Sequence, residues 1–418
     1  MFTITSLTEA IKKFALPFNT PGDFTPLFTA IGESRVVLLG EASHGTSEFY
    51  KVRSELTKRL IEEKGFTLIA VEGDWPSTQR VNRFIKGYDT DLNKQNVLNV
   101  FERWPTWMWA NEEISELVLW LEKHNKQLKN NRKIGFYGID VYSLWESLDE
   151  VINYLRKTNP EGTDMAFAKK AISCFEPFNR HPETYAFSSI HISDACVEEV
   201  TKLVSSIRTN EKQYEDKEEA HLNLKINALV AQNAEEYYRA MVRSDELSWN
   251  VRDEHMVEAI NEIMDYHGKD SKIIIWAHNT HIGDASATDM KKEGLTNVGE
   301  ILRMQNKREN VFSVGFGTYS GEVIAANEWG TTPKRMTVPP ARKDSWEDML
   351  HGVEASDKLL IFDEENRTFF NDWVGHRAIG VVYNPDFEAY GNYVPSRIGS
   401  RYDAFIYIDK TNAISPID

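Results

Sequence analysis

Residues 35–45 read Arg-Val-Val-Leu-Leu-Gly-Glu-Ala-Ser-His-Gly, an apolar run that passes directly into a polar turn. A short apolar run that ends in turn residues is typical of a strand buried on both faces. Residues 272–281, Lys-Ile-Ile-Ile-Trp-Ala-His-Asn-Thr-His, repeat this arrangement. Polar groups that follow the strands of an open parallel sheet converge in one crevice. The two turns therefore predict a site at one edge of a sheet.

Further apolar runs alternate with helical stretches along the chain. We expect strands at 35–39, 66–71, 133–139, 272–277, 311–316, 357–362, 378–383 and 403–409. We expect helices at 47–64, 111–127, 143–157, 195–208, 217–243, 247–267 and 295–305. This alternation predicts an α/β fold with a mainly parallel central sheet and flanking helices.

The stretch from about 150 to 268 contains helices and no convincing strand. No Pro/Gly/Ser-rich linker flanks it, so a separate domain is not favoured. We interpret this stretch as a helical insertion or lid within a single domain that spans residues 1–418.

The composition narrows the class of partner. The 418 residues include 48 basic and 64 acidic side chains, a formal net charge of −16. An acidic surface argues against nucleic acid and anionic membranes as partners. No apolar run approaches the ~20 residues that span a bilayer, and the start of the chain lacks the pattern of a signal peptide. We therefore expect a cytoplasmic protein, whose oligomeric state the sequence leaves open.

Cys174 and Cys196 are the only cysteines of the chain. Two cysteines could form one bridge, but nothing in the sequence indicates a disulfide scaffold. We expect two reduced thiols.

The first turn carries a glutamate and a histidine three residues apart, Glu41 and His44. A histidine near neutrality can take a proton from water, and a carboxylate beside it can fix its tautomer. The alternative is that His44 only packs the loop. In the second turn, His278 and His281 suit metal ligation, proton transfer or hydrogen bonding to a carbonyl oxygen.

Glu72 follows the predicted strand 66–71 and should lie at the same edge of the sheet. A carboxylate there is costly to bury unless it is paired. Glu72 could orient water or raise the basicity of a histidine, or it could form a buried ion pair with Arg53 or Arg80. Arg53 keeps its charge, so it needs either such a partner or an oxyanion.

Three further groups have two interpretations each. Asp74 could contact substrate or cap a helix that starts at Trp75. Arg252 and His255 share one face of the helix 247–267, so they either reach the cleft or belong to a solvated, salt-bridged face. The aromatic cluster forms either a corner of the core or the wall of an apolar pocket. Its members are Trp104, Trp107, Met108 and Trp109.

Several common motifs are absent. The sequence has no phosphate-binding G-x-x-x-x-G-K-[ST] loop and no H-E-x-x-H zinc helix. In the Gly40–Gly45 turn, Ser43 stands one place too late for a G-x-S-x-G nucleophile elbow.

Taken together, these segments resemble the erythromycin esterase family, over roughly residues 30 to 410. The shared features are Gly40-Glu41-Ala42-Ser43-His44, Arg53, Glu72, Val251-Arg252-Asp253-Glu254-His255-Met256 and Ala277-His278-Asn279-Thr280-His281. The resemblance implies a metal-independent hydrolase that opens a macrolide lactone, with a histidine that activates water. By motif position that histidine is His44.

The resemblance and the residues lead to one expectation: an ester or lactone hydrolase that acts on a small molecule without a cofactor or metal. The expected catalytic residues are His44, Glu41, Glu72, Arg53, His278 and His281. The expected substrate-binding residues are Asp74, Trp75, Asn279, Arg252 and His255. The glutamates would keep His44 basic, while Arg53 and the His278/His281 pair would face the carbonyl oxygen.

Two alternatives remain open: a metallohydrolase that uses the same histidines, and a non-catalytic small-molecule binding protein. Differences from the macrolide-cleaving members at Gly45-Thr46 and Gly73-Asp74-Trp75 leave the substrate open.

Overall fold

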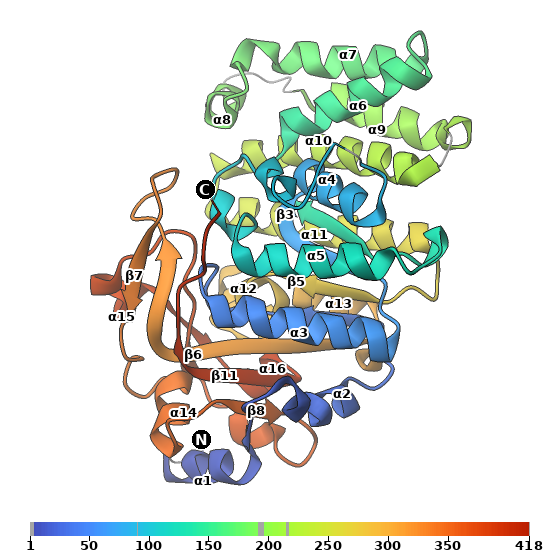
Figure 1. Cartoon of the computed structure of the whole chain (residues 1–418). Coiled ribbons are helices and arrows are strands. Elements are labelled where there is room, and N and C mark those ends of the chain that lie inside the picture. Colours follow the sequence, from blue (N-terminus) through green and yellow to red (C-terminus); the bar gives the residue numbers. More distant parts are fainter. Residues whose placement is uncertain (1–3, 90, 191–195, 215–216, 418) are drawn as a thin grey trace. The chain divides into compact units, whose positions relative to one another are not determined.

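The structure, a computed structural model, describes residues 4–89, 91–190, 196–214 and 217–417 (Figure 1). The chain forms two compact units, each of which is described by itself. The sheet unit comprises Met1–Ile69, Lys94–Ile134 and Lys272–Asp418, and the helical unit comprises Ala70–Asn93 and Gly135–Ser271.

The sheet unit is built on six strands in the order β1-β8-β11-β6-β2-β5, with β7 paired to the far part of β6. Its strands are β1 (Leu16–Pro17), β2 (Val36–Leu39), β5 (Ile273–Trp276), β6 (Val311–Ala325), β7 (Lys334–Val338), β8 (Lys358–Ile361) and β11 (Ala404–Thr411), and a separate antiparallel pair is formed by β9 (Val374–Arg377) and β10 (Tyr393–Ser396). Strand β2 pairs in parallel with both neighbours, so that Leu39 lies opposite Trp276 of β5 and Val314 of β6. The two polar turns thus leave adjacent parallel strands at the same edge.

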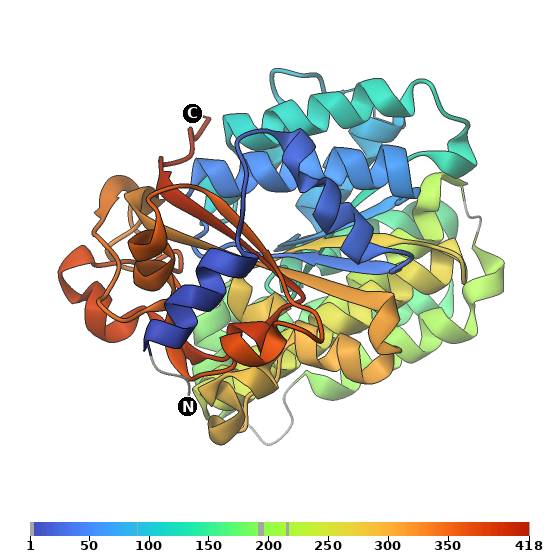
Figure 2. The ribbon, with the colours of Figure 1, turned by 90° about the horizontal axis from the view of Figure 1, so that it is seen from below.

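Helices cover both faces of this sheet. They are α1 (Ile4–Phe14), α2 (Thr25–Ile31), α3 (Ser47–Lys64), α5 (Glu112–Asn125), α12 (Asn279–Ile282), α13 (Val298–Gln305), α14 (Trp346–Val353), α15 (Glu388–Gly391) and α16 (Ile398–Arg401). Figure 2 shows α3 and α5 on one side of the sheet and α13 on the other. Helix α3 turns Phe49, Leu56 and Leu60 inward, and all three are buried. Its bounds are those predicted from the sequence.

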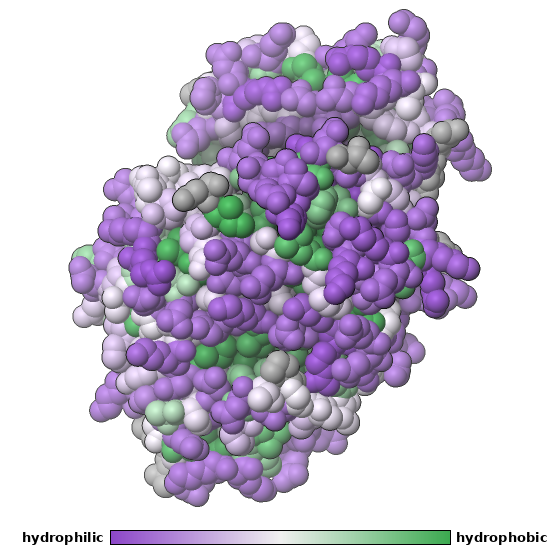
Figure 3. Space-filling view, viewed as in Figure 1, coloured by the Kyte–Doolittle hydropathy of each residue, from purple (hydrophilic) through white to green (hydrophobic). Residues whose placement is uncertain are grey.

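The helical unit contains β4 (Gly135–Asp140), most of β3 (Leu68–Asp74), and seven helices within the residues that the structure describes. The helices are α4 (Trp75–Lys86), α6 (Leu144–Thr158), α7 (Thr163–Phe175), α8 (Pro182–Ser189), α9 (Val197–Thr209), α10 (Ala220–Met241) and α11 (Asp245–His267). Helices α6 to α10 share one apolar core that includes Leu148, Val151 and Phe175. Hydrophilic residues cover most of the face that Figure 3 presents, in keeping with a chain in which 27% of residues are charged.

The predicted α/β class with a mainly parallel sheet and flanking helices is confirmed. The regular structure described between residues 144 and 267 is helical throughout. The grouping of these helices as an insertion in one domain stays a prediction. Within the described residues, no helix combines the length and the apolar character that a membrane crossing requires.

Two predicted strands differ from the structure. Strand β6 continues beyond the predicted 311–316 to Ala325. Glycines and polar residues weaken the apolar pattern there, and the glycines at 315 and 317 leave room for the rings of Tyr402 and Phe405. The predicted strand 378–383 is wrong. Its backbone donors bond to separate partners instead of one strand: Ala378 to Asn392, Ile379 to Ala42 and Tyr383 to Ala326.

The expectation of reduced thiols is also wrong for this structure. Cys174 at the end of α7 and Cys196 before α9 form a disulfide, with Cα atoms 5.9 Å apart. Packing of α7 against α9 brings the two cysteines together, and no sequence motif indicated that packing.

We expect reduction of this disulfide to lower the stability of the helical unit by about 3 kcal/mol, because a cross-link that closes a loop of this size restricts the unfolded chain. Thermal unfolding of wild type with and without reductant measures the loss. The Cys174→Ser/Cys196→Ser variant should match the reduced protein and be insensitive to reductant. Two titratable thiols in the folded, unreduced protein would contradict the pairing.

The turn that follows β2 depends on a glycine. The carbonyl oxygen of Gly45 accepts hydrogen bonds from the backbone N–H groups of Ile324 and Ile414, at 3.1 and 3.0 Å. A Cβ atom at position 45 would lie 2.0 Å from the carbonyl oxygen of Ile324. Backbone atoms cannot move aside as a flexible side chain can, so only glycine fits here.

We therefore expect Gly45→Ala to destabilise the protein by about 1–3 kcal/mol, the usual cost of overpacking. Gly352→Ala is the matched control, since a Cβ at that exposed position on α14 has no atom within 4 Å. The melting temperature of Gly45→Ala should fall below that of Gly352→Ala. Equal melting temperatures for both variants would refute the steric argument.

Candidate functional site

In the sheet unit, the first turn places His44 against a buried carboxylate and arginine. The Nδ1 atom of His44 lies 3.0 Å from Oε1 of Glu41, and the guanidinium of Arg53 donates through Nη2 to the other oxygen, Oε2. Glu41 and Arg53 are 1% and 0% exposed, and His44 is 7% exposed. The guanidinium also lies over the rings of Tyr50 and Trp276, 4.6 and 4.5 Å from their centroids. Both oxygens of Glu41 are therefore engaged.

This contact determines the tautomer of His44. An ionised carboxylate only accepts hydrogen bonds, so Nδ1 of a neutral His44 carries the proton and donates it to Glu41. The lone pair then stands on Nε2. The hydroxyl of Tyr50 donates to the carbonyl oxygen of His44 at 2.8 Å and anchors the backbone of the turn. His44 thus has the tautomer that a general base requires.

The second turn gives His278 the opposite tautomer. His278 is the N-cap residue of α12. Its Nδ1 accepts from the backbone N–H of Thr280 at 3.3 Å, and the Thr280 hydroxyl, 2.8 Å away, can donate to the same nitrogen. Because Nδ1 is an acceptor here, the proton of a neutral His278 is on Nε2. The His44 and His278 rings lie 4.9 Å apart, centroid to centroid. His281, 2% exposed, lies in the same turn. The structure therefore brings a proton acceptor and a proton donor side by side.

Asn279 joins the two turns. Its backbone N–H donates to the carbonyl oxygen of Glu41 at 2.9 Å. Its side chain is fully buried and bonds to both backbone groups of Phe316 on β6. Gly40 makes this possible, since a Cβ there would lie 2.2 Å from Oδ1 of Asn279. Asn279 is thus a structural link between the two turns, and its expected contact with substrate stays a prediction.

In the helical unit, Glu72 belongs to a buried ion-pair cluster. Nη2 of Arg252, on α11, donates to Oε1 of Glu72 at 2.7 Å, and Nε and Nη2 bind both oxygens of Asp140 at 2.9 and 2.7 Å. Burial opposes the charge of Arg252, but Asp140 and then Glu72 outweigh it and hold the pKa of Arg252 well above its usual value. Within the helical unit, the structure therefore pairs Glu72 with Arg252, an arginine that the sequence had not indicated as its partner.

The other predicted residues of the helical unit are engaged inside it. Burial lowers the pKa of His255 to about 4, against a smaller opposing effect of Asp140, so the ring is neutral near pH 7. Asn233 donates to its Nδ1 at 3.1 Å. Trp75 is fully buried, stacks on Tyr137 and donates to Asn223 at 2.8 Å. Asp74 occupies the N-cap position of α4, but its side chain makes no capping hydrogen bond.

The structure therefore assembles Glu41, His44, Arg53, His278 and His281 in the sheet unit. It assembles Glu72, Arg252 and Asp140 in the helical unit. The expectation that both groups act in one site stays a prediction. Asp140 was missed, although it directly follows the predicted strand 133–139 and that position was the available signal.

Two further features bear on the metallohydrolase alternative and on the two interpretations of the aromatic cluster. Among the described residues, no cluster of three or more His, Cys, Asp or Glu side chains is arranged to hold a metal ion. Trp107, Met108 and Trp109 are buried, as expected for a corner of the core, whereas Trp104 is half-buried and pairs with Trp329 at 4.6 Å.

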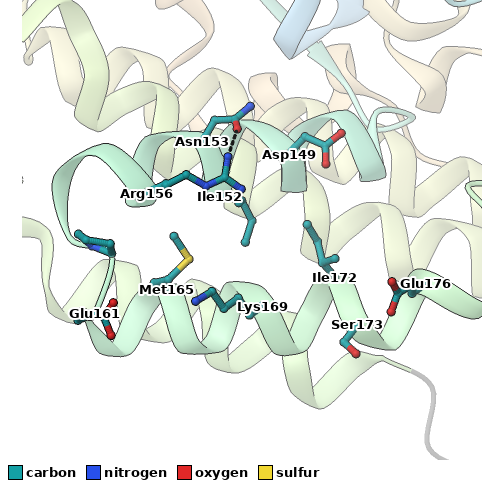
Figure 4. Close-up of a pocket in the computed structure, with 11 residues that line it drawn as sticks. Asp149, Ile152, Asn153, Arg156, Glu161, Met165, Lys169, Ile172, Ser173 and Glu176 are labelled. Atoms are coloured by element: carbon teal, nitrogen blue, oxygen red, sulfur yellow. Dashed lines mark hydrogen bonds between the residues drawn. The ribbon is translucent and has the colours of Figure 1, made fainter.

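The helical unit also has a cavity of about 560 Å³ between α6 and α7. Figure 4 shows Arg156 and Lys169 extending into it from the two helices, with Met165 between them. Asp149, Glu161 and Glu176 also line it, so its charges are mixed. The described lining residues include none of those predicted for the site.

Comparison with known proteins finds a matching family model and related sequences that agree with each other. A family model described as Erythromycin esterase matches residues 61–411. The chain is 26% identical over 392 residues to "Erythromycin esterase type II" of Escherichia coli, covering 85% of this chain and 88% of that protein. It is 22% identical over 422 residues to the "Putative hydrolase YbfO" of Bacillus subtilis (strain 168), covering 96% and 90%.

Solved structures share the fold. A succinoglycan biosynthesis protein superposes with a TM-score of 0.79 at 21% identity, over 99% of each chain. A mutant of the erythromycin esterase EreC in its open conformation superposes with a TM-score of 0.68 at 14% identity, over 99% of this chain and 98% of that one. The family match covers residues 61–411, most of the sequence. The predicted motifs lie in a fold that these solved structures share. The chain belongs to the erythromycin esterase family.

Proposed function

We propose that this protein hydrolyses a carboxylic ester or lactone of a small molecule, with His44 as the general base. Membership of the erythromycin esterase family supports a hydrolase. The observation that carries the proposed ester hydrolysis is the pair of opposite tautomers: Nε2 of His44 has a free lone pair, and Nε2 of His278 carries a proton. The centroids of the two rings lie 4.9 Å apart.

In the proposed reaction, Nε2 of His44 takes a proton from water while the water oxygen attacks the carbonyl carbon. Negative charge develops on the carbonyl oxygen, and a preorganised donor there is often the largest single catalytic effect. His278 supplies that donor through its Nε2–H, and His281 is proposed as a second one. When the C–O bond breaks, the imidazolium of His44 returns its proton to the leaving alkoxide.

Glu41 and Arg53 act behind His44. The carboxylate of Glu41 holds Nδ1–H and stabilises the imidazolium that forms during the reaction. Arg53 is fully buried and bonded to Glu41. We therefore propose Arg53 as a positioning residue for Glu41, in place of the contact with the carbonyl oxygen that the sequence suggested.

We expect His44→Ala to lower kcat by about 10²- to 10⁴-fold, the usual cost of losing a general base. Turnover is measured on p-nitrophenyl esters and on a panel of lactones that includes macrolides, with ring opening followed by mass spectrometry. The control is His181→Ala, which removes an exposed histidine of the helical unit. A folded His44→Ala variant with normal turnover would remove His44 from the mechanism, and a wild type inert on every substrate would contradict the proposed function.

We expect prolonged chelation to leave turnover unchanged. The physical reason is that, among the described residues, no three His, Cys, Asp or Glu side chains are arranged to hold a metal ion, and Nε2 of His278 carries a proton in the contact described above. Protein dialysed against a chelator is assayed in metal-free buffer. A loss of activity that one added divalent metal restores would favour the metallohydrolase alternative.

A further inference from the structure

A fully buried polar chain lies behind the turn that carries His278 and His281. It runs from Asn279 to His376, at the end of β9, and on to Glu347, in the first turn of α14. All three side chains are 0% exposed. These residues come from segments about 70 and 100 positions downstream of the turn, and the esterase mechanism does not use them.

The orientation of the Asn279 amide is determined by the backbone of β6. Its Oδ1 accepts from the N–H of Phe316 at 3.2 Å, and its Nδ2 donates to the carbonyl oxygen of Phe316 at 2.7 Å. Rotation of the amide by half a turn would place donor against donor and acceptor against acceptor. The second hydrogen of Nδ2 therefore faces Nε2 of His376, at 3.2 Å.

That contact admits only one form of His376. Because Nε2 faces a donor, it must be the unprotonated nitrogen, so the proton is on Nδ1. Nδ1 donates it to Oε1 of Glu347 at 2.6 Å. A doubly protonated His376 would turn an N–H toward the amide hydrogens of Asn279. The network is therefore satisfied only while His376 is neutral.

The surroundings of His376 favour the neutral form. Burial lowers the pKa of His376, the charge of Glu347 raises it, and Arg401 and Arg377 lower it again, with a net decrease. The rings of Tyr402 and Phe405 pack against the imidazole at 5.9 and 5.2 Å. Since its pKa lies below the ordinary histidine value, the folded protein resists protonation of His376 as the pH falls, while the unfolded chain does not.

We infer that His376, held by Glu347, is a positioning residue for the candidate site. It fixes the side chain of Asn279, whose backbone N–H ties the His278 turn to Glu41 at 2.9 Å. Arg401 adds to this by donating to the carbonyl oxygen of Asn279 at 2.9 Å. The catalytic part of this inference rests on the proposed function, because the spacing of His44 and His278 affects turnover only if both act on one substrate.

Two substitutions separate the contacts of His376. His376→Gln keeps an acceptor near the position of Nε2, so it can still meet Asn279. His376→Asn keeps a donor near Nδ1 for Glu347 but does not reach Asn279. We expect kcat to fall about 10- to 100-fold in His376→Asn, with KM nearly unchanged, because a small displacement of a reacting group is costly. We expect His376→Gln to retain most of the wild-type kcat.

The control is His351→Asn. His351 lies on α14, the helix that carries Glu347, and like His376 it pairs through Nδ1 with a carboxylate, here Asp409 at 2.8 Å. Among the described interactions, His351 has no contact to the His278 turn. Its kcat should equal that of wild type. An unchanged kcat in His376→Asn, or equal losses in His376→Asn and His376→Gln, would overturn the positioning role.

A spectroscopic measurement decides the matter even if no ester is hydrolysed. In wild type labelled with ¹⁵N-histidine, the signals missing from His376→Gln belong to His376. We expect them to report a ring that is still neutral and protonated on Nδ1 at pH 6.5, the ordinary histidine pKa, and we expect His376→Asn to shift the signals of His278. A ring protonated on Nε2, or no change at His278, would overturn the inference, whereas a wild type without activity would overturn the proposed function instead.

Discussion

The hydrogen bonds of one buried amide hold the candidate site together. Asn279 bonds through its backbone to the turn after β2 and through its side chain to the backbone of β6. A buried amide that lost these partners would be left with unsatisfied polar groups, at a cost of about 1–3 kcal/mol for each. Gly40 is the counterpart of this constraint, since any side chain there would occupy the space of the Asn279 oxygen. The relative placement of the two turns of the candidate site thus depends on the insertion of the Asn279 side chain.

His44 and His278 present opposite hydrogen-bonding groups at Nε2, because their Nδ1 atoms have different partners. His44 presents its Nδ1 to a carboxylate, and His278 presents its Nδ1 to a backbone N–H. The first contact leaves a lone pair on Nε2, and the second leaves a proton there. A hydrogen-bond acceptor and a hydrogen-bond donor can thus be built from identical side chains by different contacts at Nδ1. His376 extends the same principle behind the site, where a neutral ring links a donor to an acceptor.

The ion pairs of the two units illustrate how far local sequence reasoning extends. The end of the predicted strand 66–71 was a sound place to expect a buried carboxylate in need of a partner, and the structure places Glu72 within β3. Its partner is Arg252, 180 positions away, and Asp140 binds the same guanidinium. Arg53 instead holds Glu41, twelve positions away on the next helix. Which arginine neutralises which acid depends on which helix packs over which strand end, and residue spacing along the chain does not contain that information.

The sequence by itself determined the buried strands β2 and β5, the helix at 47–64 and the place of Glu41, His44, His278 and His281 after strand ends, because apolar periodicity and turn residues are local properties. It also carried the family resemblance. Only the tertiary structure decided the tautomers, the buried position of Asn279, the network of His376 and Glu347, the partner of Glu72 and the Cys174–Cys196 bridge. The tautomers depend on the exact geometry of contacts within each turn. The others depend on contacts between separate segments, which form only when the packing of the elements has brought those segments together.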